Sequence, residues 1–168
     1  PEHIAAVCAA LADQNITALV HMSPLKLASA TWAEDSYPSS QIALAAQGYF
    51  SLLQGLDAHF STLESGVIAS VTAMDGRHGN IGERFNAVQC AASGVTKSYA
   101  FEQLQMRCRA LDVHPELILD PVQAAQLIHH DVFNLTGEVE VGLDRDERRW
   151  GCLLYTSDAA DDTPCVDL

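Results

Sequence analysis

The chain has 168 residues, of which 22 are acidic and 9 are Lys or Arg, so its formal net charge is −13 at pH 7. This acidity argues against a nucleic-acid partner and against an anionic membrane surface, because both require clustered Lys and Arg. A membrane span is not expected either, since the longest apolar segment, 42–60, carries Gln47, Gln54 and Asp57 and predicts an amphipathic helix.

The last seventeen residues, Cys152–Leu168, read CLLYTSDAADDTPCVDL. They resemble a translated transposase-type sequencing adapter, in which two constant blocks, CLLYTSDAAD and CVDL, flank a short variable index. We therefore expect 152–168 to be a non-native tail without a structural role, and 1–151 to be one domain truncated at both ends. A disordered acidic tail is the alternative.

Three of the five cysteines, Cys8, Cys90 and Cys108, lie outside that tail. They are widely spaced on apolar segments and form neither a disulfide framework nor a CxxC metal pair. The pattern is typical of buried thiols in a reducing compartment, which predicts a cytoplasmic protein.

Helical and strand periods alternate along the chain. The four expected strands are apolar runs of the kind that is buried on both faces of a sheet. In chain order the expected elements are a helix over Glu2–Asp13, a strand over Ile16–Met22, a loop over Lys26–Ser39, a helix over Ser40–Phe60, a strand over Val67–Met74, a helix over Arg84–Phe101, a strand over Met106–Val113, a helix over Pro121–Phe133 and a strand over Glu138–Leu143.

Two local signals sharpen this order. Asp120 and Pro121 stand at the N-cap and first position of the helix that begins there. The segment DRDERRW after Leu143 is a charged turn that leads into a further strand or a linker.

The alternation predicts an α/β fold, a truncated Rossmann-like three-layer domain with a mainly parallel sheet of four to five strands and helices on both faces. A dinucleotide site would need a Gly-rich turn directly after the first strand. No such turn follows Ile16–Met22, and the cluster DGRHGNIG at 75–82 comes after the second strand. We therefore expect no cofactor-binding residues in this chain.

The order of elements resembles the later half of a short-chain dehydrogenase/reductase. In that family a strand ends in Ser, Tyr follows thirteen residues later and Lys four beyond it, while an Asn on the preceding helix completes a proton relay. The Lys lowers the pKa of the Tyr so that the phenol can pass its proton to the substrate oxygen. The matching positions here are Thr72, Phe85, Gln89 and Ala45. The resemblance implies a degenerate site with no catalytic residue and no metal ligand.

A closer resemblance is to the ketoreductase region of type I polyketide synthases and polyunsaturated fatty acid synthases. Its first part is a truncated, cofactor-free Rossmann-like subdomain, and its second part is catalytic. The motifs that carry the resemblance, over about 16–150, are ALVHMSPL, YFSLLQGL, DGRHGN, MRCRALDVHPEL and EVEVGLDRDERRW. The Lys that these ketoreductases have on the helix before the second strand falls near Gln54, which carries no charge.

This resemblance implies a catalytically inactive structural subdomain that supports an NADPH-dependent β-ketoreductase. NADP would then be bound by a catalytic subdomain of the same chain after Trp150, and an acyl carrier protein would be a further partner. Two alternatives stay open: a fragment of a divergent free-standing reductase with shifted catalytic residues, and a cofactor-free Rossmann-like interaction module. Whether this chain is itself an enzyme is therefore undecided at this point.

Several other residues suggest chemistry but have simpler interpretations. His129 and His130 are adjacent on a helix and point about 100° apart, so they cannot share a metal. Arg77 and His78 could hold a phosphate, but an ordinary surface turn is favoured.

Two more residues lie near expected strand and helix ends. Cys90, near the start of a helix, could be a reactive thiol, but a small core residue is the favoured interpretation. His21 is interpreted as a hydrogen-bonded residue and not a base, because no Ser or Cys nucleophile is placed to use it.

Overall fold

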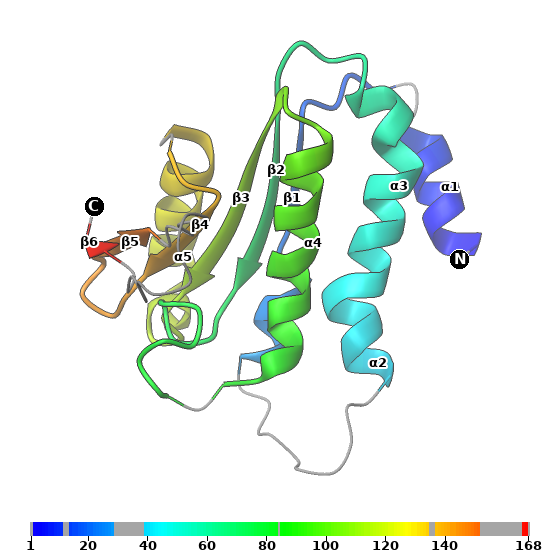
Figure 1. Cartoon of the computed structure of the whole chain (residues 1–168). Coiled ribbons are helices and arrows are strands. Elements are labelled where there is room, and N and C mark those ends of the chain that lie inside the picture. The colour runs from blue at the N-terminus through cyan, green and yellow to red at the C-terminus, as the bar shows by residue number, and fades with distance from the viewer. Residues whose placement is uncertain are drawn as a thin grey trace, which may run out of the picture.

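The computed structural model describes residues 2–11, 14–28, 39–83, 85–134, 137–151 and 166–167. It is a three-layer α/β domain built on one sheet (Figure 1). Within the described residues, no helix is long and apolar enough to cross a bilayer.

Among the described residues, the first half of the chain contributes three α-helices and two strands, and the second half two α-helices and four strands. The elements are α1 (Glu2–Leu11), β1 (Ala18–His21), α2 (Ser39–Ile42), α3 (Gly48–Phe60), β2 (Gly66–Thr72), α4 (Cys90–Glu102), β3 (Met106–Val113), α5 (Pro121–His129), β4 (Glu140–Leu143), β5 (Arg149–Gly151) and β6 (Val166–Asp167). A π-helical segment, Ala43–Gln47, joins α2 to α3, and another, His130–Asn134, extends α5.

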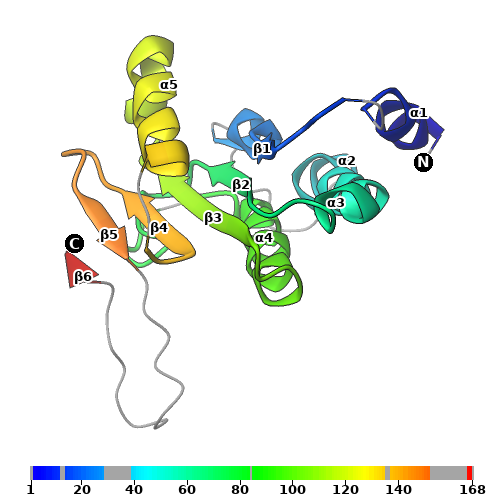
Figure 2. The same cartoon turned by 90° about the horizontal axis from the view of Figure 1, so that it is seen from above.

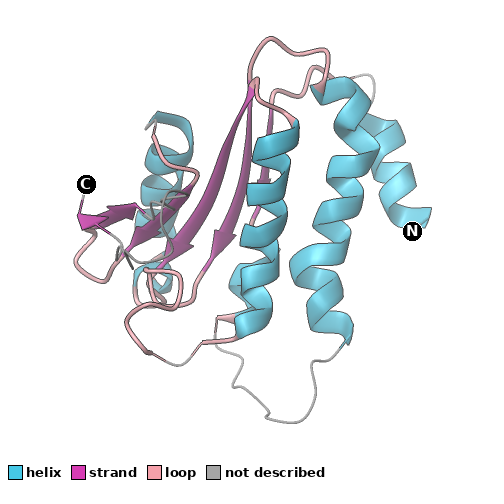
Figure 3. Ribbon diagram, in the orientation of Figure 1, coloured by secondary structure: helices cyan, strands magenta, loops and turns pink. Residues whose placement is uncertain are grey.

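The strands are ordered β1-β2-β3-β4-β5-β6 across the sheet. The first four run parallel, as the alternation of elements predicts, and β5 and β6 are antiparallel. The helices α3 and α4 cover one face and α5 covers the other, while α1 lies outside α3 (Figures 2 and 3). The predicted fold class is confirmed.

Each face of the sheet has its own apolar core because successive strand residues point to opposite faces. Toward α5, Val71 and Leu111 pack with Ile128 and Val132. Toward α3 and α4, Ile68 packs with Leu53 and other buried residues of those helices. This explains why β2 and β3 read as continuous apolar runs.

The N-terminal signals at α5 are confirmed. The Asp120 side chain accepts hydrogen bonds from the N–H groups of Val122 and Gln123, and Pro121 occupies the first helical position. The charged segment after Leu143 forms a turn that leads into β5, so β4 and β5 make an antiparallel hairpin.

The boundaries differ at several elements. The helix expected over Arg84–Phe101 begins later, with a 3-10 turn at Ala87–Gln89 followed by α4, because Asn86 is extended and its side chain caps the N–H of Val88. The first strand is shorter than Ile16–Met22, since β1 pairs only over Ala18–His21.

Four expectations fall partly outside the described residues. They are the end of the helix expected over Glu2–Asp13, most of the loop expected over Lys26–Ser39, the first residue of the helix expected over Arg84–Phe101, and the expected tail. Of the expected tail, only Val166 and Asp167 are described. They pair with β5 and add a sixth strand of two residues, and the absence of a structural role for 152–168 stays a prediction.

Candidate functional site

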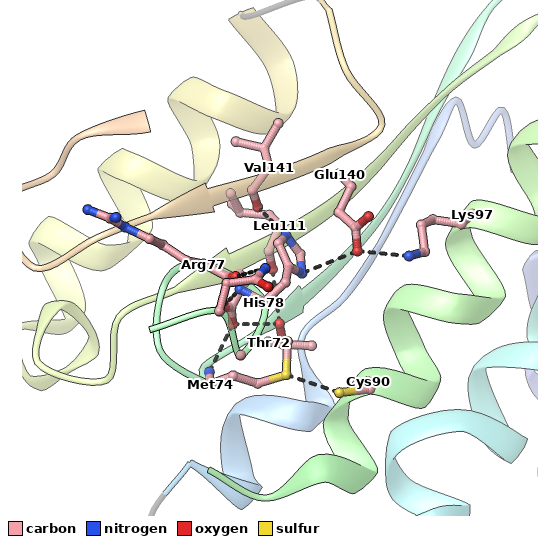
Figure 4. A network of polar contacts seen from close by, with 12 residues as sticks. Thr72, Met74, Arg77, His78, Cys90, Lys97, Leu111, Glu140 and Val141 are labelled. Carbon is pink, nitrogen blue, oxygen red and sulfur yellow. Dashed lines mark hydrogen bonds and ion pairs between the residues drawn. The ribbon is translucent and has the colours of Figure 1, made fainter. Parts of the chain in front are cut away.

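The site implied by the sequence lies at the carboxyl ends of β2 and β3, where open parallel sheets usually bind ligands. Thr72 ends β2 and is in register with Asp112 of β3. The Thr72 hydroxyl donates to Asp112 Oδ1 at 2.8 Å, and both residues are fully buried (Figure 4). The one hydroxyl that survives from the family pattern is therefore engaged within the protein.

Asp112 also holds the loop that follows β2. Its carboxylate accepts backbone N–H hydrogen bonds from Met74 at 2.8 Å, Asp75 at 3.3 Å and His78 at 3.0 Å. A buried carboxylate in such a ring of backbone donors needs no cationic partner to be satisfied.

A second buried carboxylate, Asp75, organises the rest of the loop. It accepts the N–H groups of Arg77 at 2.8 Å, Gly79 at 2.8 Å and Ile81 at 3.1 Å. Six backbone N–H groups of this loop thus point at the protein's own carboxylates, where a phosphate-binding loop would direct them at its ligand. The loop lies only partly at the surface, because Asp75 and Gly76 are buried while Arg77 and His78 are half-buried.

Arg77 is held by the β4–β5 hairpin. Its guanidinium lies 3.4 Å from the centroid of the Trp150 ring and 2.9 Å from Asp144 Oδ2, which also accepts the Trp150 indole N–H at 2.8 Å. Burial alone would raise the pKa of Asp144, but the hydrogen bonds from Trp150 and Arg77 hold that pKa below its ordinary value. Gly76 permits this docking, because a Cβ there would clash with the Leu143 carbonyl oxygen.

His78 connects the loop to β4 and α4. Its Nε2 is 2.9 Å from the Val141 carbonyl oxygen, and its Nδ1 lies 3.6 Å from Glu140 Oε1, which pairs with Lys97 Nζ at 2.8 Å (Figure 4). Lys97 therefore neutralises Glu140.

The resemblance matches Gln89 and Phe85 to the family's Lys and Tyr, and both side chains contact other parts of the protein. Gln89 is fully buried, and its side-chain amide accepts the Ala73 N–H at 2.8 Å and donates to the Ala73 carbonyl oxygen at 3.1 Å. Phe85 precedes the helix and does not lie on it, and its ring covers Gly79, where a Cβ would come within 2.7 Å of it.

The fourth degenerate position, Ala45, is buried on the π-helical segment before α3. Its carbonyl oxygen lies 3.1 Å from His21 Nε2, and the His21 ring stacks on Tyr49 with centroids 4.5 Å apart. Burial lowers the pKa of His21. His21 is therefore a hydrogen-bonded residue at the end of β1, in agreement with the sequence interpretation.

The remaining candidates from the sequence are Cys90, His129 and His130. Cys90 Sγ lies 3.4 Å from Met74 Sδ, and the partial burial of the thiol raises its pKa. Cys90 is exposed, however, so its interpretation as a core residue is wrong. His129 at the end of α5 and His130 in the π-helical segment after it are exposed, and the described part of the chain contains no group of three or more metal-ligating side chains.

Sequence reasoning missed the two carboxylates that organise this region. A signal existed for Asp112, because it is an acidic residue near the end of MRCRALDV, a strand expected to be buried on both faces. Such a residue at the carboxyl end of a central strand implies a specific polar partner. The partner could not be identified from spacing, since the donors lie 34 to 40 residues earlier in the chain.

Comparison with solved structures identifies the fold. Similar structures include a metagenomic short-chain oxidoreductase in complex with NADP (19% identity, TM-score 0.52, covering 74% of this chain and 62% of that one) and a hydroxysteroid dehydrogenase from Escherichia coli (16%, 0.51, 77% and 56%). A 7α-hydroxysteroid dehydrogenase complexed with NADH and 7-oxo glycochenodeoxycholic acid is also similar (15%, 0.50, 81% and 58%).

No family model and no curated protein matches the sequence. The chain spans about 56 to 62% of the length of these three structures. At these identities the likeness concerns the fold alone. The chain therefore has the Rossmann-like fold of the short-chain dehydrogenase/reductases.

Proposed function

We propose that this chain is a catalytically inactive structural subdomain that supports the NADPH-dependent β-ketoreductase of a multidomain polyketide or polyunsaturated fatty acid synthase. The observation that carries the proposal is the internal use of every group at the family's catalytic positions. Thr72 bonds Asp112, Gln89 bonds the Ala73 backbone, and Phe85 packs on Gly79.

The loop after β2 supports the same proposal. Its backbone donors are bound to Asp75 and Asp112, and Arg77 is held between Asp144 and Trp150. These contacts satisfy the polar groups at the strand ends and leave them without a free anion-binding group among the residues described above. Such a unit suits a bracing role, because binding and catalytic sites need donors that are free to meet a ligand.

The partners follow from the same proposal. NADP is bound by a catalytic subdomain of the parent chain and not by this one, and an acyl carrier protein brings the substrate to that subdomain. The parent protein works in the cytoplasm, in keeping with the free thiols of Cys8, Cys90 and Cys108.

Calorimetric titration with NADPH and NADH tests the absence of a cofactor site. We expect no saturable heat up to about 1 mM cofactor, with a free-standing short-chain reductase as the positive control in the same buffer. A saturable site in the micromolar range would contradict the proposal.

The second candidate function is a fragment of a divergent free-standing reductase, which the fold of the similar structures favours. Resequencing the source DNA beyond the codon for Trp150 separates the two. A Gly-rich strand–helix turn, followed by Ser and Tyr at the family spacing, is expected for the synthase. A stop codon shortly after Trp150 would support the second candidate.

A further inference from the structure

A groove of about 520 Å³ lies between α3 and α4, away from the strand ends described above. Its deeper lining is apolar and includes Leu53, Val95 and Tyr99, while Phe50 is 55% exposed at its rim. The two helices lie side by side along their length (Figure 1). This volume is in the range of small-molecule sites, which are mostly apolar with a few placed polar groups.

The charged groups of the groove are all acidic. Asp57 and Glu102 belong to its lining, and none of the described lining residues is Lys, Arg or His. In the described part of the chain neither carboxylate forms an ion pair, although ion pairs occur elsewhere in the domain.

Asp57 is oriented with one oxygen available. Both side-chain hydrogen bonds that it accepts, from the Tyr99 hydroxyl at 3.1 Å and from Gln103 Nε2 at 2.8 Å, reach Oδ1. Burial, and then the bond to Asp57, raise the pKa of Tyr99, so the phenol remains a donor. These two donors fix the carboxylate, and among the described residues no side chain donates a hydrogen bond to Oδ2.

The two ends of the groove differ in polarity. Phe50 and Asp57 are seven residues apart on α3, which corresponds to about 10 Å along a helix. Its apolar rim is at the Phe50 end, and its two carboxylates are at the Asp57 end, where Glu102 also ends α4. A ligand that fits must be apolar at one end and cationic at the other.

From this arrangement we propose that the groove is a binding site for a small elongated organic cation, with an aryl or alkyl group along Leu53 and Val95 and an ammonium group at Asp57 and Glu102. The proposal does not depend on the proposed function. A second copy of this chain suits the groove less well, because it would bring two more carboxylates to this face with no lining cation to pair them.

Three nearly isosteric probes test the proposal by NMR titration: 4-phenylbutylammonium, 4-phenylbutanol and 4-phenylbutyrate. We expect the ammonium to shift the amide signals of Gly94 and Ser98, which line the groove. It should bind about tenfold more tightly than the alcohol, because a charged donor strengthens the hydrogen bond to a carboxylate. The butyrate should not bind, since its charge repels both acids.

Two variants locate the site. Asp57→Asn retains a hydrogen-bond acceptor for Tyr99 and should remove most of the preference for the ammonium. Gly94→Leu should abolish binding of all probes, because a Cβ at Gly94 meets no atom within 4 Å and the larger side chain would fill the groove. Leu is a better helix former than Gly, so this variant should fold at least as well as the parent.

A matched control excludes a general charge effect. Glu64→Gln removes one negative charge at an exposed residue outside the groove and should leave the ammonium titration unchanged. Equal affinity for all three probes, no binding of the ammonium, or shifts confined to residues outside the groove would overturn the proposal. A dimer in sedimentation that Gly94→Leu dissociates would overturn it too, because a second copy would then cover the groove.

Discussion

Gln89 makes two hydrogen bonds to the backbone of Ala73, one to its N–H and one to its carbonyl oxygen. This pair ties the start of α4 to the end of β2 in a fully buried environment. A Lys at position 89, as in an active reductase, would leave the Ala73 carbonyl and amide groups poorly paired and bury an ammonium.

We therefore expect Gln89→Lys to lower the free energy of unfolding by about 3–5 kcal/mol, and Gln89→Ala by about 2–4 kcal/mol. Urea denaturation followed by circular dichroism measures both. Gln126→Lys, at an exposed position of α5, is the matched control and should change stability by less than about 0.5 kcal/mol. Equal effects at the two positions would contradict the structural role of Gln89.

Restoring the family's residues should not restore ketone reduction. In the double variant Phe85→Tyr, Gln89→Lys, the Thr72 hydroxyl still donates to Asp112 and no cofactor turn has been added. Positioning of a hydride donor is worth roughly 7–11 kcal/mol, which a correctly placed acid cannot replace.

The measurement is the oxidation of NADPH with a decalone substrate, alongside an active short-chain reductase. Circular dichroism shows whether the double variant is folded; if it is not, Phe85→Tyr alone is assayed. Turnover above background in either variant would refute the scaffold proposal.

Among the acidic residues of the domain, substitution of Asp112 should lower the free energy of unfolding most. Asp112→Ala leaves the Thr72 hydroxyl and three backbone N–H groups without their acceptor. We expect a loss of about 3–5 kcal/mol in urea denaturation. Thr72→Val, which removes a single donor, should cost about 1 kcal/mol. Asp146→Ala is the control, because its ion pair with Arg148 is exposed and contributes about 0–1 kcal/mol.

His21 should make the domain less stable as the pH falls through the range in which free histidine titrates. Burial lowers the pKa of His21 in the folded state. The unfolded chain therefore takes up a proton first, near pH 6.5, and the stability falls from there toward the folded-state pKa.

Melting temperatures between pH 7.5 and 5.5 test this for the parent and for His21→Gln. The difference between the two should shrink as the pH falls, because only the parent carries this penalty. All other histidines are common to both proteins, so their titration cancels. A difference that is constant with pH would show that His21 does not titrate in this way.

Deleting residues 152–168 should change the melting temperature by no more than about 2 °C. Among the described residues of this segment only Val166 and Asp167 pair with the sheet, and they add two residues to its edge. The control is Trp150→Ala in the deleted chain, which removes the ring beneath Arg77 and should lower the melting temperature by several degrees. A large loss on deletion alone would show that the tail packs on the domain.

The amino-acid sequence alone determined the layers of this protein. The alternation of apolar runs with helical periods predicted parallel strands between helices, and the runs at β2 and β3 are buried on both faces as their composition required. The sequence also predicted the helix N-cap at Asp120, because the two N–H groups that it accepts belong to residues no more than three positions later. Local signals of this kind need no knowledge of the rest of the fold.

The resemblance to reductases also singled out four positions in the sequence, but not what the residues at those positions do. The structure shows three sets of contacts at the strand ends that the sequence did not reveal. Gln89 bonds Ala73, Thr72 donates to Asp112, and Asp75 and Asp112 together accept six backbone N–H groups. Parallel strands place residues some forty positions apart side by side, and only the tertiary structure sets which donor meets which acceptor. The outward groove between α3 and α4 was decided in the same way, by the packing of two helices that are distant in the chain.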